Sequence, residues 1–82
     1  MPLNKYVRYN KPLQIPKDYE PMVSLLIGAR LKRELSQEKL AHRIGCTASL
    51  IHKWETHKRI PSGFMLICWL DALGYDITVT ER

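Results

Sequence analysis

The fold is decided by residues 35–61, LSQEKLAHRIGCTASLIHKWETHKRIP, where two short helix patterns flank one glycine. Ser36 offers a side-chain oxygen to the free amides of a helix predicted over residues 37–44. Gly45 supplies the left-handed backbone position that ends this helix abruptly. Thr47 is the next capping residue, and it opens a further helix that we expect to end at residue 55 or 56. The segment therefore predicts two helices joined by a tight turn.

The helix predicted over residues 47–56 has two chemically different faces. Ile51 and Trp54 are three residues apart with Leu50 alongside, so they share an inward face. The outward face carries few bulky apolar groups, so a base edge in the major groove of DNA can approach it. Its small, hydroxyl and basic side chains are suited to read bases, and we assign that role to Ala48, Ser49, His52 and Lys53. An ordinary solvated face of an amphipathic helix is the plainer alternative.

A second group of polar residues lies at helix starts or in the loop after residue 55, where proteins usually hold phosphates. We expect phosphate contacts from Gln37, Thr47, Thr56, Lys58 and Arg59. The net charge of +5 and the pI of about 9.5 favour a polyanionic partner such as double-stranded DNA, although they say nothing about the fold.

The flanking segments complete an all-α class, a compact helix-turn-helix domain of four to five helices over residues 18–74. A first helix is expected to start near Pro21, because proline is tolerated in a first turn. A last helix is expected over residues 62–73, with Gly74 closing it. Residues 1–17 are predicted to form a basic N-terminal arm whose prolines exclude a continuous helix. This arm follows DNA in one interpretation, and is a short strand or a frayed terminus in the others.

The last helix has too many apolar side chains for one buried stripe. We assign Leu66, Leu70 and Leu73 to the core. The other apolar side chains of this helix are expected to pack against a second surface, such as another subunit. In the tail, residues 75–82, the side chains of residues 75–80 alternate between apolar and polar, a pattern typical of a strand. A lone strand leaves its backbone groups unpaired, so it pairs either within the chain or with its copy in a homodimer. We favour the homodimer, with its interface at Phe64, Trp69, Tyr75, Ile77 and Val79.

Composition excludes several classes of protein. The chain has 82 residues, enough for one domain, and is 45% hydrophobic, as globular proteins are. Its longest apolar run, residues 64–70, is too short to cross a bilayer, and its start lacks an apolar secretory core. Two cysteines make no disulfide framework, so we expect a reduced, cytoplasmic setting.

Several of these residues together resemble the phage-repressor or Cro (XRE-type) helix-turn-helix family. The matching positions are Arg30, Leu35-Ser36-Gln37, Leu40-Ala41, Gly45, Ile51, Glu55, Pro61, Leu66, Leu70 and Leu73-Gly74. The resemblance implies that Gln37 contacts phosphate and braces the reading helix. It also implies base contacts from Ala48, Ser49, His52 and Lys53, and a salt bridge between Arg30 and Glu55. Glu34 and His57 stand where that family often has glycine.

Arg30 and Glu55 also lie beside the inward faces of their helices, so an ion pair between them is expected to be partly buried and structural. Catalysis is not expected, since no nucleophile arrangement or phosphate-cradling glycine loop occurs. His42, Cys46, His52 and His57 lack the spacing of zinc ligands, so we predict no metal and no cofactor. The sequence predicts a transcriptional repressor. The alternatives are an antitoxin that also binds a toxin, and a protein-interaction module that does not bind DNA.

Overall fold

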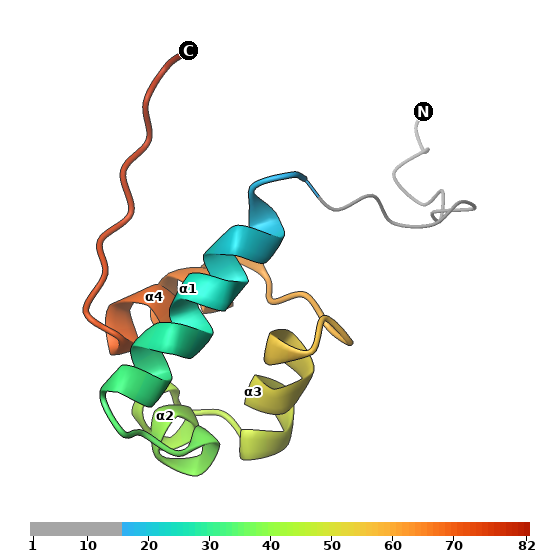
Figure 1. The fold of residues 1–82 in the computed structure, drawn as a ribbon, viewed down its shortest axis with the longest axis vertical. Helices are drawn as coiled ribbons and strands as arrows, with labels where there is room; N and C mark the ends of the chain where they lie inside the picture. Colours follow the sequence, from blue (N-terminus) through green and yellow to red (C-terminus); the bar gives the residue numbers. More distant parts are fainter. Residues whose placement is uncertain (1–15) are drawn as a thin grey trace.

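The computed structural model describes residues 16–82, and it contains four helices in this part of the chain (Figure 1). They are α1 (Tyr19–Lys32), α2 (Gln37–Ile44), α3 (Ala48–Glu55) and α4 (Gly63–Ala72). Helices α2 and α3 pack closely together, α2 also contacts α4, and α1 contacts α3. The predicted all-α class is therefore confirmed, and each predicted helix lies within a few residues of its expected bounds.

Three of the four helices begin at a hydroxyl side chain that accepts a backbone amide. The Ser36 hydroxyl oxygen accepts the amide of Lys39 at 3.0 Å, and Thr47 accepts that of Leu50 at 3.2 Å. Ser62 does the same at the start of α4. Each cap satisfies an amide that has no partner inside its own helix, so these local contacts place the helix starts. Helix α1 begins at Tyr19 without such a side-chain bond, and Pro21 lies in its first turn.

Within residues 16–82, four residues have a left-handed backbone, and two of them are not glycine. Gly45 and Gly74 have φ angles of 94° and 84°, as predicted for the ends of α2 and α4. Glu34 and His57 have φ angles of 55° and 63°. The turns thus keep the geometry that glycine normally provides, even though a side chain there costs about 1–2 kcal/mol.

The core lies where the inner faces of the four helices meet. Trp54 of α3 and Trp69 of α4 pack against each other with ring centroids 5.2 Å apart and planes inclined by 36°. The other buried side chains are Val23, Leu26, Ala29, Leu35, Leu40, Ala41, Ile51, Leu70 and Leu73. Burial of two indole rings and these aliphatic groups supplies most of the driving force for folding.

The prediction for Trp69 was wrong. We expected this residue at a subunit interface, but its side chain is fully buried in the core. Leu66, which was assigned to the core, is only partly buried and packs against it. The expectation that α4 leaves some apolar side chains outside the core is confirmed for Phe64 and Ile67, which are 75% and 50% exposed.

The C-terminal strand is not present in the described part of the chain. Residues 75–82 follow α4 without forming a strand and leave the body of the domain (Figure 1). A strand requires a neighbour that shares its backbone hydrogen bonds, and no described segment lies beside the tail to provide them. The predicted basic arm falls almost entirely outside the described residues. None of the described helices has the length and the apolar character needed to cross a membrane.

Candidate nucleic-acid interface

Helix α3 is held by one face and free on the other. Ile51 and Trp54 on its inner face have no more than 1% of their surface exposed. Ser49, His52 and Lys53, three of the predicted base-reading residues, are exposed on the outer face, and Ala48 is half-buried at the helix start. The structure thus brings these four positions onto one short helix, whose backbone is fixed from behind by the core.

A hydrogen-bonded cluster at Glu55 fixes the far end of α3. The Glu55 carboxylate accepts Arg30 Nε at 2.7 Å on Oε2 and Arg30 Nη2 at 3.0 Å on Oε1. Gln37 Nε2 donates to the same Oε1 at 2.9 Å, and Arg30 Nη1 donates to the Leu35 carbonyl oxygen at 2.8 Å. The side chains of Arg30 and Glu55 are only 12% and 6% exposed. The predicted ion pair is confirmed, and it ties α1, α2 and α3 into one unit.

Gln37 has a clear structural role at the first turn of α2. Its amide group donates to Glu55 while its side chain remains only half-buried. This bond agrees with the bracing role that the family resemblance implies. Its contact with a DNA phosphate remains a prediction.

The two threonines that flank α3 differ in what they can offer to a phosphate. Thr47 is exposed, and its oxygen accepts the Leu50 amide, so its hydroxyl hydrogen remains available to a phosphate oxygen. Thr56 Oγ1 donates its hydrogen to the His52 carbonyl oxygen at 2.7 Å. Of the two hydroxyls, that of Thr47 is therefore the more available to a phosphate. The hydroxyl of Thr56 is used in the bond that ends α3.

Cations extend the candidate surface beyond α3. Lys58 and Arg59 are both exposed, and their backbone amides donate to the Lys53 carbonyl oxygen at 2.9 and 3.2 Å. The chain therefore folds back at the end of α3, which places these two residues next to the outer face. These backbone bonds keep Lys58 and Arg59 near Lys53, and all three residues are exposed.

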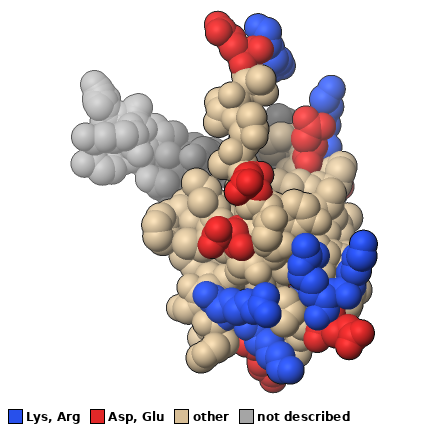
Figure 2. Space-filling model, turned by 90° about the vertical axis from the view of Figure 1, so that its left-hand side faces the viewer, with Lys and Arg blue, Asp and Glu red and all other residues tan. Residues whose placement is uncertain are grey.

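Positive charge alone does not identify this surface. Figure 2 shows a different side of the molecule, the one nearest the tail, where Lys and Arg side chains also gather over the part of the domain farthest from the tail. Exposed cations at the end of α1 and on α2 include Lys32, Arg33, Lys39 and Arg43. The exposed residues of α3, which are Ser49, His52 and Lys53, include no acidic side chain, whereas Glu20 is exposed on α1 and Glu38 on α2.

Sequence reasoning missed two contacts that support the site and its surroundings. The rings of Tyr19 and His57 lie with centroids 6.0 Å apart, so the start of α1 packs against the turn that follows α3. Arg43 of α2 donates to the Ala72 carbonyl oxygen of α4 at 3.4 Å. Both contacts join segments far apart in the chain, so the spacing of residues within one helix does not predict them.

The predicted interface residues do not all lie at the surface. Phe64, Ile77 and Val79 are 75%, 54% and 91% exposed, which leaves them available to a partner. Tyr75 is half-buried and packs against the core, with the Arg33 guanidinium 5.7 Å from its ring centroid. Trp69 belongs to the core and is removed from this set.

The described cysteines and histidines do not form a cluster that could bind a metal ion. Among the described residues no three His, Cys, Asp or Glu side chains lie close enough together to hold a metal ion. Cys46 packs against the core, and partial burial raises the pKa of its thiol above the ordinary value. Its Sγ points to the Thr47 carbonyl oxygen at 3.7 Å. The thiol therefore stays protonated near neutral pH and serves as a packing group.

Comparison with known families gives one match. A family model described as Helix-turn-helix matches residues 26–79, more than half of the chain. The matched region begins inside α1 and includes α2, α3, α4 and most of the tail. Comparison with curated proteins gave no significant match, and neither did comparison with solved structures.

Proposed function

Because the chain belongs to the XRE-type helix-turn-helix family of DNA-binding transcription regulators, we propose that it is a repressor that binds a palindromic operator as a homodimer. Helix α3 enters the major groove of each half-site, and the bound dimer blocks access to the promoter. The observation that carries the proposal is the contrast on α3 between the fully buried Ile51 and the exposed Ser49 and Lys53.

The outer face of α3 has the chemistry to distinguish bases. Lys53 is suited to the guanine acceptors of the major groove, and Ser49 to either a donor or an acceptor on a base edge. The methyl group of Ala48 contacts a thymine methyl, and His52 donates or accepts according to its protonation. Because two of these side chains are small, DNA shape contributes to the choice of operator.

Phosphate contacts position the dimer on the duplex. Thr47 and Gln37 lie at the starts of α3 and α2, where helix ends favour an anion. Lys58 and Arg59 reach the backbone from the loop after α3. These contacts make affinity depend on salt concentration, because each neutralised phosphate releases counterions.

The homodimer is supported by apolar groups that the single chain leaves in water. Phe64 on α4 and Val79 in the tail are each at least three-quarters exposed. Two copies related by a two-fold axis present two α3 helices, which doubles the sequence that is read and matches a palindrome. Removing residues 75–82 is expected to produce monomers in light scattering.

The test is selection of bound sequences from a random DNA pool, followed by affinity measurements on the selected duplex. We expect a palindromic sequence, and we expect Lys53→Ala to lower discrimination against random DNA by about 1–3 kcal/mol. Arg43→Ala is the matched control, because it removes one cation that bonds to α4 instead of facing DNA. A pool from which no sequence is enriched would end the proposal and favour a protein-interaction module.

A second candidate, an antitoxin that represses its own operon and binds a toxin, is favoured by the exposed Phe64 and Ile67 on α4. Such a protein needs an apolar surface separate from its DNA-reading face. Co-expression with the product of a neighbouring gene tests it: Ile67→Ser should abolish co-purification while operator affinity is retained. Co-purification that is unaffected by Ile67→Ser would remove this part of α4 from any such interface.

A further inference from the structure

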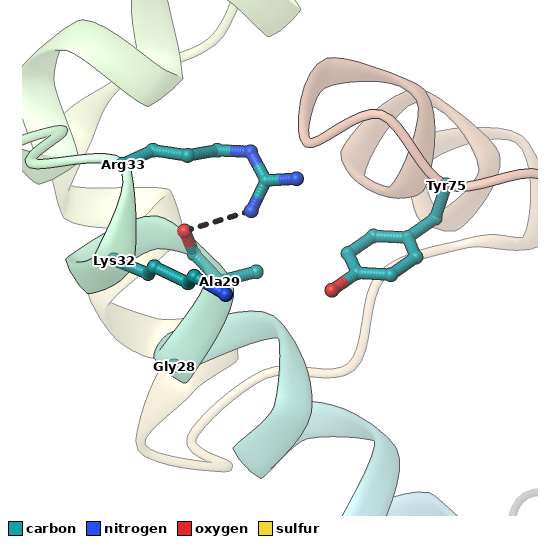
Figure 3. A pocket seen from close by; sticks show the side chains of 5 residues that line it. All are labelled: Gly28, Ala29, Lys32, Arg33 and Tyr75. Atoms are coloured by element: carbon teal, nitrogen blue, oxygen red, sulfur yellow. Dashed lines mark hydrogen bonds between the residues drawn. The ribbon is translucent and has the colours of Figure 1, made fainter.

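A hollow of about 440 Å³ lies between the C-terminal half of α1 and the start of the tail. Its lining residues are Gly28, Ala29, Lys32, Arg33 and Tyr75 (Figure 3). Two of these residues are cations, and none of the five is acidic. Figure 3 shows the Arg33 guanidinium bonded to the Ala29 carbonyl oxygen, with Tyr75 on the opposite side of the hollow and the Lys32 side chain next to Ala29. The hollow is therefore chemically suited to a carboxylate.

Part of the hollow is already organised to receive such a group. Arg33 Nη1 donates to the Ala29 carbonyl oxygen at 3.1 Å, and the guanidinium lies 5.7 Å from the Tyr75 ring centroid. These contacts hold the guanidinium in place, while its other N–H groups make no hydrogen bond to the described residues. A guanidinium oriented in advance loses little conformational entropy when it binds a carboxylate.

Gly28 lines the hollow and is unusual for its position. It lies in the middle of α1, where glycine costs about 1 kcal/mol relative to alanine. A Cβ atom added there would meet nothing within 4 Å among the described residues, so packing within this chain does not explain the absence of a side chain. A second chain that approaches α1 closely at this point would explain it.

The tail carries a face that complements this hollow. In an extended chain Ile77, Val79 and Glu81 point to the same side, so two apolar groups are followed by a carboxylate. On α1 the apolar Leu25, which is 53% exposed, lies one turn before Gly28 and is followed by Lys32 on the same stripe. The distance from residue 77 to residue 81 in a strand is about 13 Å, and from residue 25 to residue 32 in a helix about 10 Å.

The direction of the tail decides which copy provides it. Figure 1 shows the tail starting beside the end of α1 and running back in the direction of its start. Glu81 of the same chain is therefore carried away from Lys32 and Arg33. A two-fold axis across α1 reverses this direction, so the tail of a second copy brings its Glu81 to these two cations.

We propose that the homodimer exchanges its C-terminal tails: Ile77 and Val79 of each copy pack over Leu25 and Gly28 of the other, and Glu81 pairs with Lys32 and Arg33. This inference rests on the homodimer of the proposed function, but not on its DNA specificity. The exchange buries apolar groups that are 54% and 91% exposed in the single chain. Its two contact sites are identical, as two-fold symmetry requires.

Charge exchange between two variants tests the proposal by sedimentation of the full chain. Lys32→Glu and Glu81→Lys each place like charges together at both contact sites, so each variant alone should dimerise about tenfold more weakly or worse. An equimolar mixture of the two should restore dimers of about the parent affinity. In that heterodimer one site keeps the original pair and the other holds the reversed pair.

The mixture separates exchange between copies from docking of each tail on its own chain, because own-chain docking gains nothing from mixing. Lys39→Glu, which makes the same charge change on α2, is the control and should leave dimerisation unchanged. Gly28→Leu, which adds a bulky side chain to the lining of the hollow, should abolish the dimer while far-UV circular dichroism stays helical. A dimer that needs residues 75–82 but is insensitive to Lys32→Glu and Gly28→Leu would mean that the tails pair with each other, and would overturn the proposal.

Operator binding is measured separately on the same variants. If the mixture dimerises but no variant or parent binds a selected duplex, the proposed function fails while the tail exchange stands. If the parent binds a palindrome and mixing restores no dimer, the exchange fails alone.

Discussion

Replacement of Glu55 by alanine is the most direct test of how α3 is held in place. The Glu55 carboxylate accepts three hydrogen bonds of 2.7 to 3.0 Å, two from Arg30 and one from Gln37. In Glu55→Ala the Arg30 guanidinium, only 12% exposed, keeps its bond to the Leu35 carbonyl oxygen but loses its counter-charge. The Gln37 amide loses its acceptor at the same time.

The expected loss is large relative to the stability of so small a domain. Leaving a buried charge without its partner costs about 3–5 kcal/mol. A domain of 82 residues has a total free energy of unfolding of about 4–12 kcal/mol. Each kcal/mol lowers the midpoint of thermal unfolding by about 4–8 °C in a domain of this size, so Glu55→Ala should lower it by at least about 12 °C.

Urea unfolding followed by circular dichroism measures this loss. Asp76→Ala, which removes a carboxylate from the exposed tail, is the control and should change the free energy of unfolding by no more than about 0.5 kcal/mol. In Arg30→Met/Glu55→Leu no charge is left alone, so more than half of the loss should be recovered. A loss below about 1 kcal/mol in Glu55→Ala would refute the assignment of this cluster as the brace of α3.

Three further outcomes are expected. Trp69→Ala should lower the free energy of unfolding by about 3–5 kcal/mol at every protein concentration, because the side chain is fully buried within one chain. A loss that appears only in dilute protein would instead indicate that Trp69 lies at a subunit interface. Glu34→Gly should raise the free energy of unfolding by up to about 1 kcal/mol in a urea titration, because glycine adopts a φ of 55° without strain. Glu38→Gly, inside α2, is the control and should lower the free energy of unfolding by about 1 kcal/mol. Equal effects of the two substitutions would show that Glu34 is unstrained. Arg59→Ala should weaken binding to all duplexes alike and reduce the slope of log affinity against log salt by about one, and an unchanged slope would remove Arg59 from the phosphate contacts.

Sequence patterns were most informative where the interactions are local. The side chains of Ser36, Thr47 and Ser62 each accept a hydrogen bond from the backbone amide three residues ahead. The order of residues is therefore enough to place the starts of these three helices. Gly45 ends α2 because its own backbone favours positive φ. The partition of α3 into Ile51 and Trp54 behind and Ser49 and Lys53 in front follows from helical periodicity in the same way.

The partners of individual side chains required more than periodicity. The resemblance predicted the pair of Arg30 and Glu55, which are 25 residues apart, but it did not predict that Gln37 would join them through Glu55 Oε1. The contact of Tyr19 with His57 and the hollow between Arg33 and Tyr75 also join distant segments. Such contacts depend on how whole helices cross, which the spacing of residues along one helix does not specify.

The sequence by itself determined the four helices, the caps of α2, α3 and α4, and which face of α3 is exposed, because each depends on residues within one or two helical turns. Only the tertiary structure decided that Trp69 is core and that Phe64 is surface, although both are large apolar groups on the same ten-residue helix. The reason is that burial follows from the space left between other helices. The position of the tail was decided in the same way, since an alternating segment becomes a strand only where a neighbour completes its hydrogen bonds.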